Sequence, residues 1–206
     1  MLRKGLIWLC PVFILFTSFV VPGNAIRPAS IVKKWVVNGS SSLCVNGSTN
    51  INKFSCEIPS YDQTDTITVT EDAGDRGVRL SGGISLKVQS FDCHNVIMTA
   101  DLRKTLKEKQ FPMLDISFLS LNCLPGLTSR PEAVTGLVNI EIAGVTRRFE
   151  INYQVSKDAH GTIRLVGTQH VNFTDFNLVP PKKLGGMIRT NDQLSVAFQL
   201  NMKALD

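Results

Sequence analysis

Histidine and cysteine are the residue types of this chain whose side chains could carry out chemistry. The three histidines are His94, His160 and His170. His94 lies close to Asp92, but no GxSxG, HExxH or glycine-rich phosphate-loop motif accompanies any histidine. The glycine that follows His160 indicates an exposed turn, and His170 is predicted on the outer face of a strand. We therefore predict that the protein is not an enzyme.

Four cysteines follow the N-terminal segment and indicate disulfides if the chain is exported. They are Cys44, Cys56, Cys93 and Cys123, and an even number in an exported chain favours disulfide bonds. Three pairings are possible, of which we prefer Cys56–Cys93 together with Cys44–Cys123. A zinc site is the alternative, but the wide spacing contains no CxxC pair, and we predict no metal.

The N-terminus has the features of an export signal. Arg3 and Lys4 precede an apolar run over residues 6–21, and small residues, Gly23 and Ala25, stand where a signal peptidase would cleave. The alternative is a membrane anchor, for which the apolar run is short. We predict a cleavable secretory signal in the first 25 residues and a periplasmic or secreted protein.

The remaining residues, 26–206, are long enough for one domain with a sizeable core. The full chain carries a mild formal charge of +5, and no basic patch is interleaved with aromatic residues, so nucleic acid is not an expected partner. No second apolar segment is long enough to span a bilayer, so we expect no permanent membrane span in the mature protein.

Residues 136–155 show most clearly how the chain would fold. Apolar residues occur at every second position on both sides of Ala143 and Gly144, which is the pattern of two half-buried strands joined by a tight turn. The alternating residues are Val138, Ile140 and Ile142, then Phe149, Ile151, Tyr153 and Val155.

The same period of two recurs from end to end and changes once. Residues 31–37, 42–45, 51–58, 78–88, 114–118, 163–173 and 194–202 are predicted strands, with a bend at Gly82 and Gly83. Residues 98–110 are predicted to form a short helix, capped by Thr99 or Asp101, whose stripe of Leu102 and Leu106 seals one end of the domain.

About eight mostly antiparallel strands with one helix fit either a β-sandwich or a closed barrel. The long strands, the paired glycines and the single helix favour the barrel. The predicted fold class is mainly β: an extended, antiparallel, lipocalin-like β-barrel of about eight strands with one short α-helix. Whether side chains fill such a barrel decides whether it can hold a ligand.

The order of these signals resembles the YceI-like family of exported lipid- or polyisoprenoid-binding proteins. No single piece is specific, but together they extend over most of the mature chain. The matching residues are Ser42-Leu43, Gly47-Ser48-Thr49-Asn50, Phe54, residues 88–98, Asp101-Leu102, Leu106-Lys107, Phe111-Pro112, Ile116-Ser117-Phe118, Gly136, Ile142-Ala143-Gly144-Val145-Thr146-Arg147, the Gly167 strand, Asp175-Phe176-Asn177-Leu178 and the closing strand. The cysteines are not a general feature of that family.

The resemblance implies a hydrophobic channel for an isoprenoid or fatty-acid-like tail, no other cofactor, and a homodimer in some members. Ordinary core packing is the alternative role for each lining residue taken alone. The lining candidates are Phe54, Ile84, Leu86, Phe118, Phe149, Ile151, Tyr153, Leu165 and Phe198, with Met98 and Phe176 at the mouth.

Polar contacts with the head of such a lipid would be few. Tyr153 could offer a hydroxyl to a quinone or alcohol head, or hydrogen-bond within the protein. Lys182 and Lys183 could attract an anionic head, or belong to a solvated turn. We expect an exported carrier or sequestering protein for an amphipathic lipid; the alternative is a structural or adhesive β-domain with a filled core that binds protein or glycan.

Overall fold

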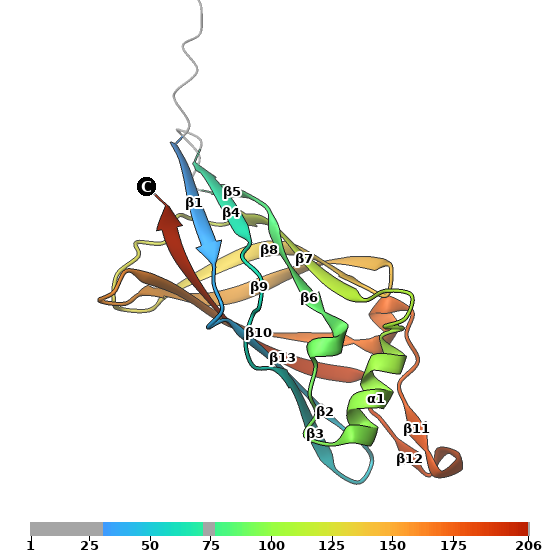
Figure 1. Ribbon diagram of the computed structural model, residues 1–206. Coiled ribbons are helices and arrows are strands. Elements are labelled where there is room, and N and C mark those ends of the chain that lie inside the picture. Colours follow the sequence, from blue (N-terminus) through green and yellow to red (C-terminus); the bar gives the residue numbers. More distant parts are fainter. Residues whose placement is uncertain (1–30, 72–76, 206) are drawn as a thin grey trace, which may run out of the picture.

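The computed structural model describes residues 31–71 and 77–205, so the expected signal segment lies outside the described residues. Most of the chain is β-structure (Figure 1). The strands are β1 (Ile31–Val37), β2 (Ser42–Ser48), β3 (Lys53–Ile58), β4 (Thr66–Glu71), β5 (Val78–Ser81), β6 (Gly83–Lys87), β7 (Met113–Leu121), β8 (Glu132–Ile142), β9 (Val145–Lys157), β10 (Thr162–Asn172), β11 (Lys182–Lys183), β12 (Ile188–Arg189) and β13 (Gln193–Leu205). The helical elements are α1 (Val96–Thr105) and the 3₁₀ turns η1 (Val88–Ser90), η2 (Phe173–Phe176) and η3 (Leu184–Gly186).

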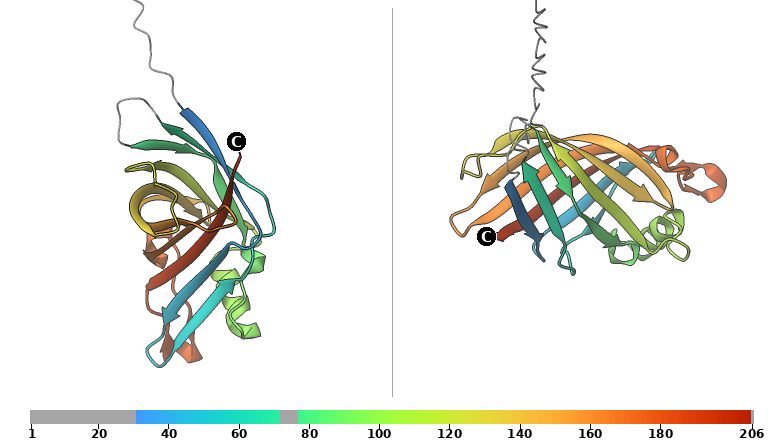
Figure 2. Two further views of the ribbon diagram at one scale, coloured as in Figure 1. Left: turned by 90° about the vertical axis from the view of Figure 1, so that its left-hand side faces the viewer. Right: turned by 90° about the horizontal axis from the view of Figure 1, so that it is seen from above.

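Eight antiparallel strands close into a barrel. The hydrogen-bonded order is β1-β4-β5-β7-β8-β9-β10-β13, and β13 pairs again with β1 through Trp35 and Ala204. The turned views in Figure 2 show the strands curving round, with α1 against one side of the barrel. The predicted mainly β fold, an antiparallel barrel with one α-helix, is therefore confirmed for the described residues.

Three further strands extend this barrel. β2 and β3 continue the sheet from β13, and β6 pairs with β7 beside β5. The predicted long strand over residues 78–88 bends at Gly82, whose φ of 106° lies in the region that favours glycine. β4 pairs with β5, but β3 is not paired with β6, so the barrel wall opens along a seam between them.

Side chains bridge this seam where the backbone ladder is missing. The hydroxyl of Tyr61 donates to the carboxylate of Asp65 and accepts a hydrogen bond from the backbone N–H of Ser85 at 3.2 Å. Lys87 forms an ion pair with Asp62 at 2.6 Å. The segment between β3 and β4 is thus fastened to β6 through side chains.

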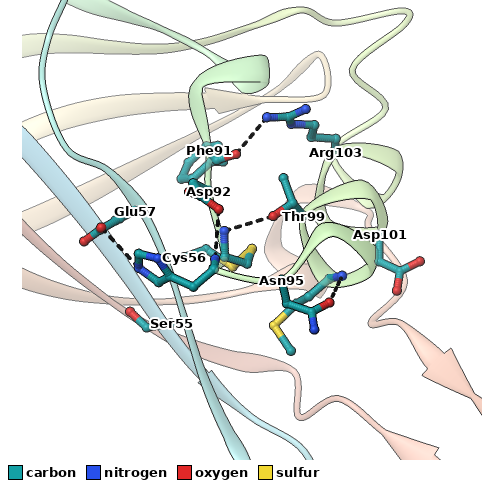
Figure 3. Close-up of a disulfide and its surroundings, with 12 residues drawn as sticks. Ser55, Cys56, Glu57, Phe91, Asp92, Asn95, Thr99, Asp101 and Arg103 are labelled. Carbon is teal, nitrogen blue, oxygen red and sulfur yellow. Dashed lines mark hydrogen bonds and ion pairs between the residues drawn. A yellow bond between two sulfur atoms is a disulfide. The ribbon is translucent and has the colours of Figure 1, made fainter.

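A disulfide between Cys56 on β3 and Cys93 closes the same seam nearer to the helix, as predicted (Figure 3). The backbone of Glu57 and Asp92 forms a bridge beside it. The loop before α1 is therefore joined to β3 both covalently and through the backbone.

The second predicted disulfide is wrong, because Cys44 and Cys123 are both unpaired. Cys44 lies on β2 and Cys123 follows β7, and β13, β10, β9 and β8 separate these strands in the sheet order. The sulfur of Cys44 instead lies 3.1 Å from the hydroxyl oxygen of Ser55 on β3.

α1 begins two residues before the predicted start and ends well before residue 110. Its N-cap is Asn95, whose side chain accepts a hydrogen bond from the N–H of Met98 at 3.0 Å. The proposed caps Thr99 and Asp101 are inside the helix. Leu102 is buried as predicted, so α1 packs its apolar stripe on the barrel. No helix among the described residues is long and apolar enough to cross a bilayer.

Candidate ligand-binding cavity

One end of the barrel is filled by side chains. This is the end where β1, β4 and β5 close the ring, and its buried residues do not line the apolar cavity at the other end. The packed side chains are Trp35, Val37, Ile67, Val69, Val78, Leu80, Leu121, Val134, Ile163, Leu165 and Met202. This half of the molecule acts as an ordinary hydrophobic core.

The other end is hollow, and its cavity has a volume of about 110 Å³. α1 and η2 contribute to its wall together with strands from both sides of the seam. Its apolar lining consists of Leu43, Val45, Ile58, Ile84, Leu86, Phe91, Leu102, Leu106, Leu114, Ile116, Phe118, Ile140, Ile142, Ile151, Val171, Phe173, Phe176, Leu178, Leu194, Val196, Phe198 and Leu200.

The composition of the lining determines what the cavity can hold. A water molecule needs about 10–15 Å³ and two or more polar partners, and apolar cavities of this size stay dry. The polar lining residues are few: Ser41, Ser42, Tyr61, Tyr153, Gln169 and Asn172. Several of them already have protein partners, such as Tyr61 with Asp65 and Ser41 with Asn201. The space therefore suits a slender apolar chain better than water.

Tyr153 is the lining residue with the most informative polar group. Its side chain is 2% exposed, and its hydroxyl has no hydrogen-bond partner among the described residues. Burial raises the pKa of Tyr153 well above its ordinary value, so the hydroxyl stays protonated at neutral pH. The cavity thus contains a hydrogen-bond donor that the protein leaves unused.

Seven of the eleven predicted binding residues line this cavity. They are Ile84, Leu86, Phe118, Ile151, Tyr153, Phe176 and Phe198. Their contact with a ligand stays a prediction.

The other four lie elsewhere. Leu165 belongs to the filled end of the barrel. Phe54 folds over Gly47, its cross-strand neighbour, and Met98 is half-buried on α1. Phe149 faces inward but contacts the ring of Phe176, with centroids 6.1 Å apart, beside the cavity.

Residues that the sequence did not single out as ligand contacts complete the wall. Val171 comes from the end of β10, Phe173 from η2 and Leu178 from the segment after η2, and Leu102 comes from α1. The stripe on α1 was predicted only to seal one end, and the structure shows that it also lines the hollow space. The signal for the residues around η2 was the aromatic sequence FTDF, which forms η2 in the cavity wall.

The histidines stay on the surface. His94 lies 3.2 Å from Glu57, measured between Nε2 and Oε1, and His160 and His170 are exposed. Within residues 31–71 and 77–205, no group of three or more histidine, cysteine, aspartate or glutamate side chains could hold a metal ion.

The geometry is that of a lipocalin-like antiparallel barrel with an apolar cavity at one end. No protein-family model matches the chain, and no curated protein matches its sequence. Solved structures share its fold. A polyisoprenoid binding domain from Saccharophagus degradans, implicated in plant cell wall breakdown, matches with a TM-score of 0.60 at 10% identity, over 83% of this chain and 98% of that chain.

BcnA from Burkholderia cenocepacia matches with a TM-score of 0.57 at 13% identity, over 81% of this chain and 96% of that chain. A YCEI protein from Campylobacter jejuni is less similar, with a TM-score of 0.46 at 13% identity, over 93% of this chain and 97% of that chain. The resemblance to the YceI-like family is confirmed as a similarity of fold.

Proposed function

We propose that residues 26–206 form an exported lipid-binding domain that carries or sequesters an amphipathic isoprenoid or fatty-acid-like lipid. The dry apolar cavity between α1, η2 and the strands is the observation on which this proposal depends. An adhesive β-domain with a filled core would not need this space. The polyisoprenoid-binding neighbour of the same fold supports the choice of ligand class.

The energetics favour a chain-like ligand. Each methylene moved from water into the cavity contributes about 0.8 kcal/mol, so eight to ten carbons contribute roughly 6–8 kcal/mol. Ordering of the ligand and loss of its free motion oppose this gain, which places the affinity near micromolar at best. Tyr153 would give a polar head one hydrogen bond.

Binding of a fluorescent fatty acid to the delipidated protein tests the proposal. We expect saturable fluorescence at one probe per chain. A long-chain isoprenoid alcohol should displace the probe, whereas a short alcohol of equal polarity should not. Fluorescence that never saturates, or that both alcohols displace equally, would show that the cavity does not bind lipid.

A further inference from the structure

Exposed apolar side chains are concentrated at one end of the molecule. Ten large apolar residues are exposed in the described parts of the chain, and six of them lie on three segments. These six form what we call the apolar rim: Ile51 in the β2–β3 turn, Val96 and Ile97 at the start of α1, and Val179, Leu184 and Met187 around β11 and β12. Each is between 65% and 87% exposed.

The three segments are neighbours in space. The side chain of Asn50 donates to the carbonyl of Met187 and accepts from the N–H of Arg189, both at 2.9 Å. Lys183 on β11 forms an ion pair with Asp101 on α1 at 2.6 Å. Figure 1 shows the β2–β3 turn, α1 and the β11–β12 tip together at the lower end of the molecule. The rim is therefore one surface rather than scattered side chains.

The segments that carry the rim also form the wall of the cavity. Leu178 lines the cavity, and the next residue, Val179, is 75% exposed. α1 presents Leu102 to the cavity and Ile97 to the outside. If the rim contacts a lipid surface, a lipid that leaves that surface is thus next to the cavity.

Basic residues outnumber acidic ones on the segments that carry the rim. Over residues 49–53, 96–105 and 179–192 the basic ones are Lys53, Arg103, Lys104, Lys182, Lys183 and Arg189, and the acidic ones are Asp101 and Asp192. Arg103 donates to the carbonyls of Gln89 and Phe91 and so faces the loop before α1. Asp101 is paired with Lys183, and Asp192 accepts hydrogen bonds from Thr174. Exposed apolar side chains on segments that also carry lysine and arginine match a bilayer with anionic head groups.

We propose that the apolar rim docks on the surface of an anionic lipid bilayer, where a lipid passes between the bilayer and the cavity. The transfer of lipid depends on the function proposed above, whereas the docking itself does not. The apolar side chains would lie at the boundary between head groups and acyl chains, and the basic side chains would contact the head groups. Attraction of this kind extends over about 8 Å at physiological salt and weakens as salt is added.

Co-sedimentation with vesicles tests the docking surface. The chain, recovered from an exporting host, is mixed with vesicles of phosphatidylcholine alone or of phosphatidylcholine with phosphatidylglycerol. We compare it with the rim variant Ile97→Ser/Leu184→Ser/Met187→Ser and with a matched control, Ile31→Ser/Val32→Ser/Leu205→Ser. The control replaces three exposed apolar side chains at the opposite end of the barrel.

We expect the wild-type chain and the control to sediment with phosphatidylglycerol vesicles, and the rim variant to lose at least about tenfold in partitioning. Added salt should weaken the binding. Equal sedimentation of the rim variant, or equal sedimentation of the wild type with vesicles of phosphatidylcholine alone, would overturn the proposal.

The fatty-acid probe separates the two proposals. Docking of a wild-type chain that binds no probe would refute the lipid-binding function and leave the docking surface standing. A wild-type chain that binds the probe but no vesicle would refute the docking surface alone. All variants are first compared by circular dichroism, and exposed sites are chosen so that each folds.

Discussion

Tyr153 and Phe198 meet edge to face across a strand that separates them. Tyr153 is on β9 and Phe198 on β13, and both are paired with Gly167 on the intervening strand β10. Their ring centroids are 5.7 Å apart and their planes are inclined by 70°. A Cβ atom on Gly167 would lie 2.4 Å from the ring of Phe198, so only glycine lets the two rings close over the strand.

Gly167→Ala should therefore destabilise the protein. Replacing glycine by alanine in an extended strand normally stabilises slightly, but here the methyl group overlaps the Phe198 ring, and such overpacking costs about 1–3 kcal/mol. Urea unfolding measures the change. Gly126→Ala is the control, since the nearest atom to its added Cβ is a flexible carboxylate oxygen of Glu132 at 3.3 Å. Equal stability of both variants would contradict the described packing.

Val196→Phe should block the cavity without unfolding the protein. Val196 is half-buried on β13 and lines the cavity, so a larger side chain has room to enter it. We expect the affinity for the fluorescent fatty acid to fall at least about tenfold, because the ring occupies space that the chain would use. Val166→Phe places the same ring on the outside of β10, where Val166 is 38% exposed. If both variants bind the probe as the wild type does, the cavity is not the binding site.

Tyr153→Phe distinguishes the contribution of the ligand's head group to the affinity from that of its tail. The hydroxyl has no partner among the described residues, so its removal should leave the free energy of unfolding nearly unchanged. An isoprenoid alcohol should then bind about tenfold more weakly, while the corresponding hydrocarbon should bind as before. Tyr61→Phe serves for comparison, since it breaks the contacts with Asp65 and Ser85 and should cost about 1–3 kcal/mol of stability. Equal losses for the alcohol and the hydrocarbon would rule out a role for the hydroxyl.

How much of this structure the sequence could predict depends on the kind of feature. The period of two correctly located the hairpin around Ala143 and Gly144, because alternation follows directly from the pleat of a strand. The start of α1 was missed because Val96 and Ile97 are β-branched and poor helix formers. They also do not continue the apolar stripe by which the rest of the helix was predicted, so Asn95 was not identified as the N-cap.

The cavity itself was harder to locate. Alternation shows which side chains point inward, but not how far along the barrel each of them lies. Leu165 and Phe198 both point inward, yet one is in the filled end and the other lines the cavity. The predicted disulfide between Cys44 and Cys123 was wrong for a similar reason, since strand order around the barrel cannot be read from the spacing of residues in the sequence.

Stability should fall steeply above about pH 10. The chain has two tyrosines, Tyr61 and Tyr153, and burial raises the pKa of both, helped for Tyr61 by its hydrogen bond to Asp65. A raised folded pKa means that the folded state keeps protons that the unfolded state loses above about pH 10, so this stability is present below that pH and is lost above it. Tyrosinate absorbance followed during an alkaline titration should rise only together with unfolding. A rise near pH 10 with the fold intact would contradict the burial of both hydroxyls.

The most direct test of lipid binding is to identify what the protein carries when it is purified. The native protein is extracted with organic solvent, and the extract is analysed by mass spectrometry beside extracts of Val196→Phe and Val166→Phe. We predict a prenyl or acyl species near one per chain in the wild type and in Val166→Phe, and its loss in Val196→Phe. An extract without lipid from all three proteins, or the same lipid in equal amount from all three, would contradict the account.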